Sequence, residues 1–129
     1  MKYIKTDKAP SAVGPYSQAV SKDNLIFTSG QIGIDPESGA FVEGIESQTK
    51  QVMENLKNVL AAEDKSFNDV VKTTIYLSDL KNYQIVNKIY GSYLSSDHLP
   101  ARSTVQVAGL PLGALIEIEV IAVKLASSG

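Results

Sequence analysis

The chain has 129 residues and a mass of 13.9 kDa; 43% of its residues are hydrophobic, 20% are charged, the net charge is -2 and the pI is about 5.3. This balance predicts one globular domain over residues 1–129, and the acidic pI argues against a protein that binds nucleic acid through a basic face. The absence of cysteine excludes disulfides, thiol nucleophiles and Cys-ligated metal clusters, and the single histidine, His98, excludes a multi-histidine metal site within one chain.

The two stretches that could direct the chain to a membrane are both unsuited to it. The N-terminal residues, MKYIKTDKAP, lack the apolar run of a signal peptide. The most apolar stretch, residues 110–126, is interrupted by Glu117, Glu119 and Lys124, which makes it unsuitable as a membrane helix. We therefore expect a soluble cytoplasmic protein.

The first half of the chain predicts a hairpin followed by a helix. Residues 17–20 and 25–29 are short β-rich runs, separated by the polar residues 21–24, as in a hairpin. From about residue 43 to residue 62, apolar side chains recur at helical spacing with polar residues between them. This pattern predicts an amphipathic helix.

The second half predicts a strand, a helix and two more strands. Residues 69–78 are rich in β-branched side chains that alternate, and Asp79 can cap a helix that follows. The helical spacing there includes Leu80, Tyr83, Val86, Tyr90 and Tyr93. Residues 102–108 and 115–125 predict two strands joined by a loop at 109–114. The order β-β-α-β-α-β-β indicates an α+β fold with two helices on one face of a mixed sheet.

The last predicted strand is apolar on both faces. Ile116, Ile118, Val120 and Ala122 form one face, whereas Glu117, Glu119, Ile121, Val123 and Leu125 form the other. Two helices can cover only one face of a sheet, so the second face needs another cover. Self-association through the sheet would supply it. The alternative is a loop that packs over Ile121 and Val123.

Arg102 is the outstanding candidate for a functional residue. Of the 12 Lys and Arg residues eleven are Lys, and Arg102 stands at the start of an otherwise uncharged strand. A guanidinium group matches a carboxylate with two parallel hydrogen bonds, which a lysine cannot do. The alternative interpretation is a structural salt bridge or a charge that protects a sheet edge.

Glu117 is the second candidate, at the border between a polar and an apolar part of its face. Partial burial there would raise the pKa of its carboxyl group and suit it to general acid–base catalysis. The alternative is a solvated strand face. If the loop at 109–114 is symmetric, the last two strands pair directly, and Arg102, Thr104, Gln106 and Glu117 share one face.

Several separated motifs resemble the YjgF/YER057c/UK114 family, also called the Rid family. The most specific is PARSTV at residues 100–105, followed by Leu110-Pro111 and by IEIE at residues 116–119. AVGPYSQA at 12–19, FTSGQI at 27–32 and VKTT at 71–74 occur at the same spacing as in the family. The resemblance covers nearly the whole chain. It implies a chorismate-mutase-like fold and a homotrimer with ligand clefts between subunits.

The resemblance also implies an activity that needs neither cofactor nor metal. The best-known members hydrolyse reactive 2-imino acids, or their 2-enamino tautomers, to 2-oxo acids and ammonia. Such imines, for example 2-iminobutanoate and 2-iminopropanoate, escape from pyridoxal-phosphate enzymes such as threonine dehydratase, so the role is control of metabolite damage. A small imino acid is then the expected partner, with neither nucleic acid nor membrane.

Site residues are carried over from the family position by position. Arg102 matches the arginine that grips the substrate carboxylate, and Glu117 the glutamate that orients or activates water. Tyr16 completes the catalytic group. The substrate-binding positions are Ser29, Gly30, Asn87 and Thr104, the last where many deaminases have cysteine.

Two other functions remain open from the sequence. A non-enzymatic module could bind 2-oxo acids through the same Arg102. An endoribonuclease or translation inhibitor, as described for some relatives, fits less well with an acidic protein that has one arginine.

Overall fold

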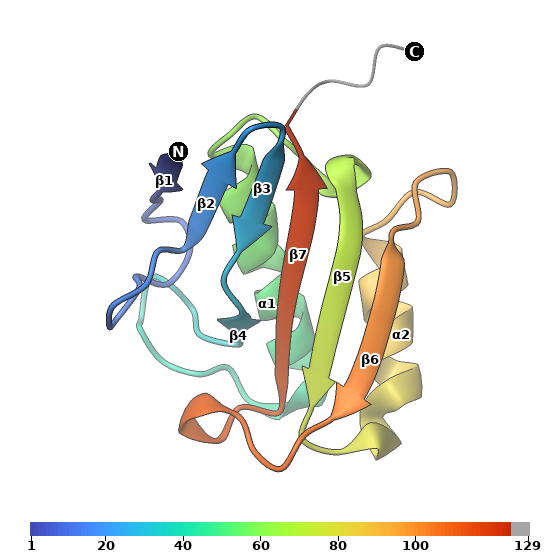
Figure 1. The fold of residues 1–129 in the computed structure, drawn as a ribbon. Coiled ribbons are helices and arrows are strands. Elements are labelled where there is room, and N and C mark those ends of the chain that lie inside the picture. Colours follow the sequence, from blue (N-terminus) through green and yellow to red (C-terminus); the bar gives the residue numbers. More distant parts are fainter. Residues whose placement is uncertain (125–129) are drawn as a thin grey trace.

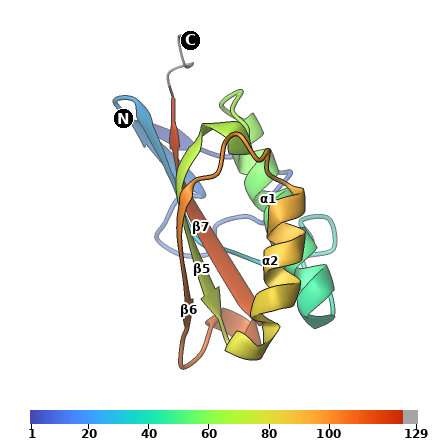
Figure 2. The ribbon, with the colours of Figure 1, turned by 90° about the vertical axis from the view of Figure 1, so that its right-hand side faces the viewer.

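The structure is a computed structural model that describes residues 1–124. Two helices lie side by side against one face of a single sheet, and the other face of the sheet is open (Figures 1 and 2). The strands are β1 (Lys2–Ile4), β2 (Ala19–Lys22), β3 (Leu25–Thr28), β4 (Gln31–Ile32), β5 (Val70–Leu77), β6 (Ala101–Gln106) and β7 (Ile116–Val123), and the helices are α1 (Gly44–Ala61) and α2 (Tyr83–Ser92). The α+β class and the two helices on one face are thus confirmed.

The sheet runs in the order β1-β2-β3-β7-β5-β6, with β4 paired to β7. Every pairing is antiparallel except that of β5 with β6, which is parallel. The parallel pair follows from the connection, since α2 crosses over the sheet between these two strands and returns the chain to the same end. The sheet is therefore mixed, as predicted, and mostly antiparallel.

The predicted hairpin is confirmed, with a tighter turn than expected. The two strands β2 and β3 pair from Ala19 and Thr28 up to Lys22 and Leu25, so that only Asp23 and Asn24 form the turn. Asp23 has φ 55, a left-handed conformation that Asp tolerates and that suits a two-residue hairpin turn. The short strands β1 and β4 were not predicted.

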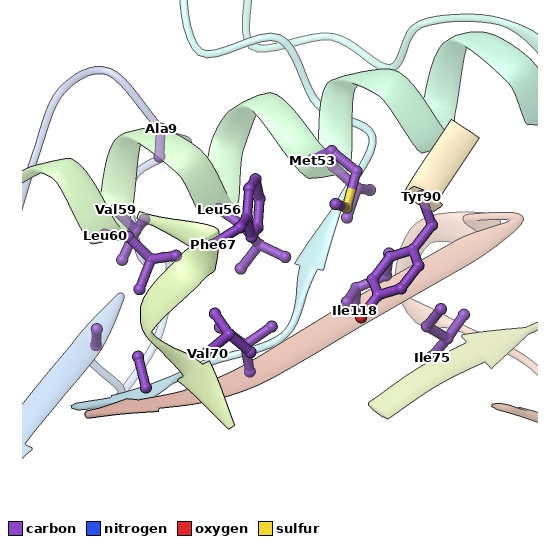
Figure 3. Close-up of a cluster of buried hydrophobic side chains, with 14 of the residues drawn as sticks. Ala9, Met53, Leu56, Val59, Leu60, Phe67, Val70, Ile75, Tyr90 and Ile118 are labelled. Atoms are coloured by element: carbon purple, nitrogen blue, oxygen red, sulfur yellow. The ribbon is translucent and has the colours of Figure 1, made fainter. Parts of the chain in front are cut away.

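The core fills the space between the helices and the sheet. Met53 and Leu56 of α1 point toward Ile75 of β5 and Ile118 of β7, and all four side chains are fully buried (Figure 3). Along β7, buried and half-buried residues alternate, so Ile116, Ile118, Val120 and Ala122 share one face as predicted, and this is the face that the helices cover. Leu125, which the sequence also placed in this strand, lies outside the described residues.

The second helix begins later than predicted. Asp79 accepts a hydrogen bond from the Lys81 N–H at 2.9 Å, but it caps a 3-10 turn over Leu80–Asn82 and not α2 itself. Two other 3-10 turns occur at Phe67–Asp69 and Pro111–Gly113. No helix among the described residues is long and apolar enough to cross a membrane.

The predicted pairing of the last two strands is wrong. β5 lies between β6 and β7, in register with Arg102 opposite Thr73 on one side and Glu117 opposite Tyr76 on the other. Directly paired residues share a face, and neighbouring residues of a strand do not. Arg102, Thr104 and Gln106 therefore lie on the helix face of the sheet, whereas Glu117 lies on the open face.

Candidate functional site

Arg102 lies at the edge of the sheet beneath α2, between two tyrosines of that helix. Its Nη2 donates a hydrogen bond to the Tyr83 hydroxyl at 3.0 Å. The guanidinium carbon is 5.7 Å from the centre of the Tyr83 ring and 5.2 Å from that of Tyr90. These distances are those of cation–π contacts, which hold the flat guanidinium group on the aromatic surfaces.

The tyrosine nearer the core is fixed by its own hydrogen bond. Tyr90 is buried, and its hydroxyl donates to Thr73 Oγ1, also buried, at 2.8 Å. Its ring reaches from α2 toward the sheet near Ile75 and Ile118 (Figure 3). Burial raises the pKa of Tyr90, while the bond with Thr73 and the charge of Arg102 act in the opposite direction.

Arg102 is half-buried and has no carboxylate partner within residues 1–124. The ion pair found there joins Lys2 to Glu63 at 2.6 Å, far from Arg102 in the sheet. The interpretation as a structural salt bridge is thus not supported. The guanidinium N–H groups that find no partner within residues 1–124 have the geometry to bind a carboxylate.

Two of the predicted binding residues lie on the same side as Arg102. The side chain of Asn87 interacts with the Tyr83 hydroxyl and, ahead of the charge of Arg102, lowers the pKa of that tyrosine. Thr104 follows Arg102 two residues along β6, on the same face. Its Oγ1 is buried and lacks a hydrogen-bond partner among the described residues. Buried polar atoms are usually hydrogen-bonded, so this oxygen has the capacity to bond a ligand.

The remaining predicted residues line a separate cleft of about 630 Å³. Tyr16, Ser29, Gly30 and Glu117 all border it, as do Pro10, Leu112 and parts of the segments around them. Tyr16 is 53% exposed, so its ring forms part of the rim. The structure thus brings together four of the seven predicted site residues in this cleft. The other three, Arg102, Asn87 and Thr104, lie together on the helix face of the sheet.

Gly30 is required where the chain passes Glu117. A Cβ atom at position 30 would lie 2.7 Å from Cδ of Glu117, closer than side-chain atoms come in proteins. Ser29 holds this segment in place, because its Oγ donates to the Ser17 carbonyl at 2.5 Å and its N–H donates to the Gln18 carbonyl at 2.9 Å. The Glu117 carboxyl group therefore rests directly on backbone.

Glu117 has the electrostatics of a general base or acid. Burial raises the pKa of its carboxyl group, and the neighbouring charge of Glu119 raises it further. Glu119 is held in turn by Tyr76, whose hydroxyl donates to Oε1 of Glu119 at 2.7 Å. A raised pKa makes a carboxylate a stronger base, which suits Glu117 to accept and return a proton.

Three functional positions were missed from the sequence. Tyr83 and Tyr76 were assigned only to a helix face and a strand, although each hydroxyl contacts a candidate site residue. Gln18, 3% exposed, was missed entirely. Its Oε1 accepts a hydrogen bond from the Thr6 N–H at 2.7 Å. Its Nε2 donates to the carbonyl oxygens of Thr6, Ala9 and Pro10, at 2.9, 3.3 and 2.7 Å. A glutamine between Ser17 and Ala19 gives no signal in the sequence for this role.

Comparison with known proteins yields one family. The family model described as Endoribonuclease L-PSP matches residues 6–124. A mouse protein named 2-iminobutanoate/2-iminopropanoate deaminase is 50% identical over 124 residues, 95% of this chain and 91% of that protein. The chloroplastic Reactive Intermediate Deaminase A of Arabidopsis thaliana is 52% identical over 120 residues, 92% of this chain; the chain spans 64% of the length of that relative.

Solved structures agree over nearly the whole chain. A crystal structure of a putative endoribonuclease from Thermotoga maritima superposes with a TM-score of 0.93 at 51% identity, covering 98% of this chain and 99% of that one. The structure of E. coli TdcF with bound serine has a TM-score of 0.92 at 38% identity, covering 97% of this chain and 100% of that one. The chain belongs to the YjgF/YER057c/UK114 (Rid) family, whose family model is described as Endoribonuclease L-PSP.

Proposed function

We propose that this protein hydrolyses 2-imino acids and their 2-enamino tautomers, such as 2-iminobutanoate and 2-iminopropanoate, to 2-oxo acids and ammonia. The observation that carries the proposal is the mouse relative, which is named for this activity and is 50% identical over 95% of the chain. The geometry fits, because Arg102 offers a carboxylate a guanidinium group that has no ion-pair partner within residues 1–124, and Glu117 offers a carboxyl group with a raised pKa.

In this mechanism the protein orients the substrate and moves protons. Arg102 binds the substrate carboxylate with its free N–H groups, which fixes the imine carbon. Glu117 takes a proton from a water molecule as the water oxygen attacks that carbon, and the product is a carbinolamine. Glu117 returns the proton to the nitrogen, which makes it a leaving group, and the C–N bond breaks to release ammonia. As the C=O bond forms, the hydroxyl proton passes to the Glu117 carboxylate, which releases it to solvent or to the departing ammonia. A protonated imine is itself a good electrophile, so the steps need no cofactor or metal.

The two halves of the site belong to different subunits of a homotrimer in this proposal. Arg102 and Glu117 lie on opposite faces of one sheet, so a single chain does not bring them together. The open face carries Phe27 and Val105, 43% and 42% exposed, beside the half-buried Ile121 and Val123. An apolar face of this kind favours self-association, which would place the Glu117 cleft of one chain against Arg102 of the next.

The experiment couples the protein to threonine dehydratase and follows the formation of 2-oxobutanoate. We expect the wild type to accelerate this step and Arg102→Lys to lose most of the acceleration, since an ammonium group lacks the two-pronged geometry of guanidinium. Lys88→Ala, an exposed change on α2, serves as the control and should behave as wild type. Normal kinetics of Arg102→Lys would contradict the assigned role.

The same assay separates the other candidate functions. A protein that binds 2-oxobutanoate but does not accelerate its formation would be a binding module and not an enzyme. RNA cleavage that survives extensive purification and disappears in Arg102→Ala would favour the endoribonuclease. A single domain over residues 1–129 and a cytoplasmic location stay predictions, the latter to be checked by fractionation of the host cells.

A further inference from the structure

The hydroxyl group of Tyr83 occupies an unusual position beside Arg102. It accepts the hydrogen bond from Arg102 Nη2 at 3.0 Å, and the side chain of Asn87 approaches the same oxygen. The Arg102 guanidinium is thus an N–H donor to this oxygen. The tyrosine ring is 38% exposed, so the hydroxyl is reachable from outside the chain.

The proton of the Tyr83 hydroxyl is donated to no acceptor within the described residues. Tyr76 and Tyr90 donate their hydroxyl protons to Glu119 and Thr73, at 2.7 and 2.8 Å. No corresponding bond from the Tyr83 hydroxyl to an acceptor is found within residues 1–124. A phenol whose oxygen already accepts hydrogen bonds is a stronger donor through its own proton, because hydrogen bonds polarise one another.

We propose that Tyr83 is a second substrate-contacting residue, whose hydroxyl donates a hydrogen bond to the same carboxylate that Arg102 binds. The inference rests on the proposed function, because it names a further group at the carboxylate site. Arg102 supplies the charge and its remaining N–H groups, and Tyr83 supplies a neutral O–H donor fixed to the guanidinium at 3.0 Å. Together they define where the carboxylate oxygens lie.

Tyr90 does not share this role. It is buried, its hydroxyl proton is taken by Thr73, and its ring supports the guanidinium carbon from 5.2 Å. Among the residues that the structure describes, only Tyr83 is both exposed and hydrogen-bonded to Arg102. Tyr90 thus supports the guanidinium group, whereas Tyr83 is the tyrosine proposed to contact the carboxylate.

The test compares a carboxylate ligand with its amide. Binding of 2-oxobutanoate and of 2-oxobutanamide is measured by titration calorimetry for the wild type and Tyr83→Phe, and imine hydrolysis is followed in parallel. Tyr83→Phe keeps the ring and removes only the donor. We expect it to weaken 2-oxobutanoate binding about fivefold, raise KM by a similar factor, and leave amide binding within about twofold.

The control is Tyr93→Phe, which removes a hydroxyl that interacts with the Lys50 carbonyl, at 3.5 Å, and with the Glu54 side chain of α1, and not with Arg102. It should leave the binding of both ligands and the hydrolysis unchanged. Unchanged 2-oxobutanoate binding in Tyr83→Phe, with normal hydrolysis by the wild type, would overturn the role of Tyr83 and leave the proposed function standing. Equal weakening of acid and amide would also overturn it, since the hydroxyl would then act only on structure. A wild type that neither binds 2-oxobutanoate nor hydrolyses the imine would overturn the function and this inference with it.

Discussion

Glu117 and Glu119 project from the same face of β7, two residues apart, and their negative charges repel each other. Burial is the larger cause of the raised pKa of Glu117, and Glu119 is the second. The bond from Tyr76 at 2.7 Å keeps Glu119 in place. The ionisation of Glu117 is therefore set partly by a neighbour that is not itself proposed to touch the substrate.

Glu119→Gln should shift the pH dependence of imine hydrolysis. Glu117 acts as a base in its ionised form, so activity falls as the pH drops through its pKa. Removing the Glu119 charge lowers that pKa, and the acidic limb of the kcat profile should move to lower pH. The new amide oxygen can still accept from Tyr76, which preserves the geometry. An acidic limb that stays in place would show that Glu119 does not tune Glu117.

Gly30→Ala should damage catalysis more than folding. The added Cβ would meet the Glu117 carboxyl group, with Cδ at 2.7 Å, and only a shift of that side chain relieves the contact. We expect kcat to fall at least about tenfold, since misplaced catalytic groups lose that much, while thermal unfolding changes little. Gly91→Ala in α2 is the matched control, because no heavy atom within 4 Å would meet its Cβ and the change favours a helix. Equal kcat values for the two variants would contradict the role of Gly30.

At the scale of elements, the N-terminal segment depends on one side chain. Gln18 satisfies backbone groups of Thr6, Ala9 and Pro10, and Pro10 borders the Glu117 cleft. Gln18→Ala leaves these groups without partners, which should destabilise the protein by about 2–4 kcal/mol. Denaturant unfolding measures the loss, and hydrogen exchange should rise at the Thr6 amide. Gln84→Ala, at an exposed position of α2, should change neither quantity; a stable Gln18→Ala with a protected Thr6 amide would refute this account.

The elements that the sequence predicted well are those with a long local pattern. α1 follows from 18 residues of helical periodicity, and β7 from the alternating Ile and Glu of 116–119 and the apolar run that continues to Val123. β1 and β4 have three and two residues, too few to show any period. The placement of β5 between β6 and β7 was missed because strand order depends on the crossover of α2, and nothing in the two strands themselves encodes it.

The parts of the site that could be predicted are likewise those with a local signal in the sequence. Arg102 stands out by composition, and Gly30 and Glu117 by the motifs around them. That Arg102 and Glu117 lie on opposite faces depends on register, which a one-residue shift inverts. Tyr83 follows the helical spacing of core residues, yet as the first residue of α2 it is 38% exposed, and its hydroxyl reaches Arg102.

At the scale of the whole molecule, the proposed site needs groups from two faces of the sheet, and we propose that a second chain supplies one of them. Each complete site in the proposed trimer takes Arg102 from one subunit and Glu117 from its neighbour. Arg102→Ala and Glu117→Gln should each be nearly inactive alone, because every site then lacks one group. Mixed trimers of the two variants contain some sites in which both groups are native.

The yield of such sites can be calculated. When equal amounts of the two variants are unfolded together and refolded, a given site receives a native Arg102 in half of the cases and a native Glu117 in half. About a quarter of the wild-type specific activity should therefore return, if the subunits mix at random. Native mass spectrometry of the same sample reports the number of subunits. Activity that stays at the level of the separate variants, in oligomers shown to be mixed, would mean that each chain builds its own site and that the open face serves another purpose.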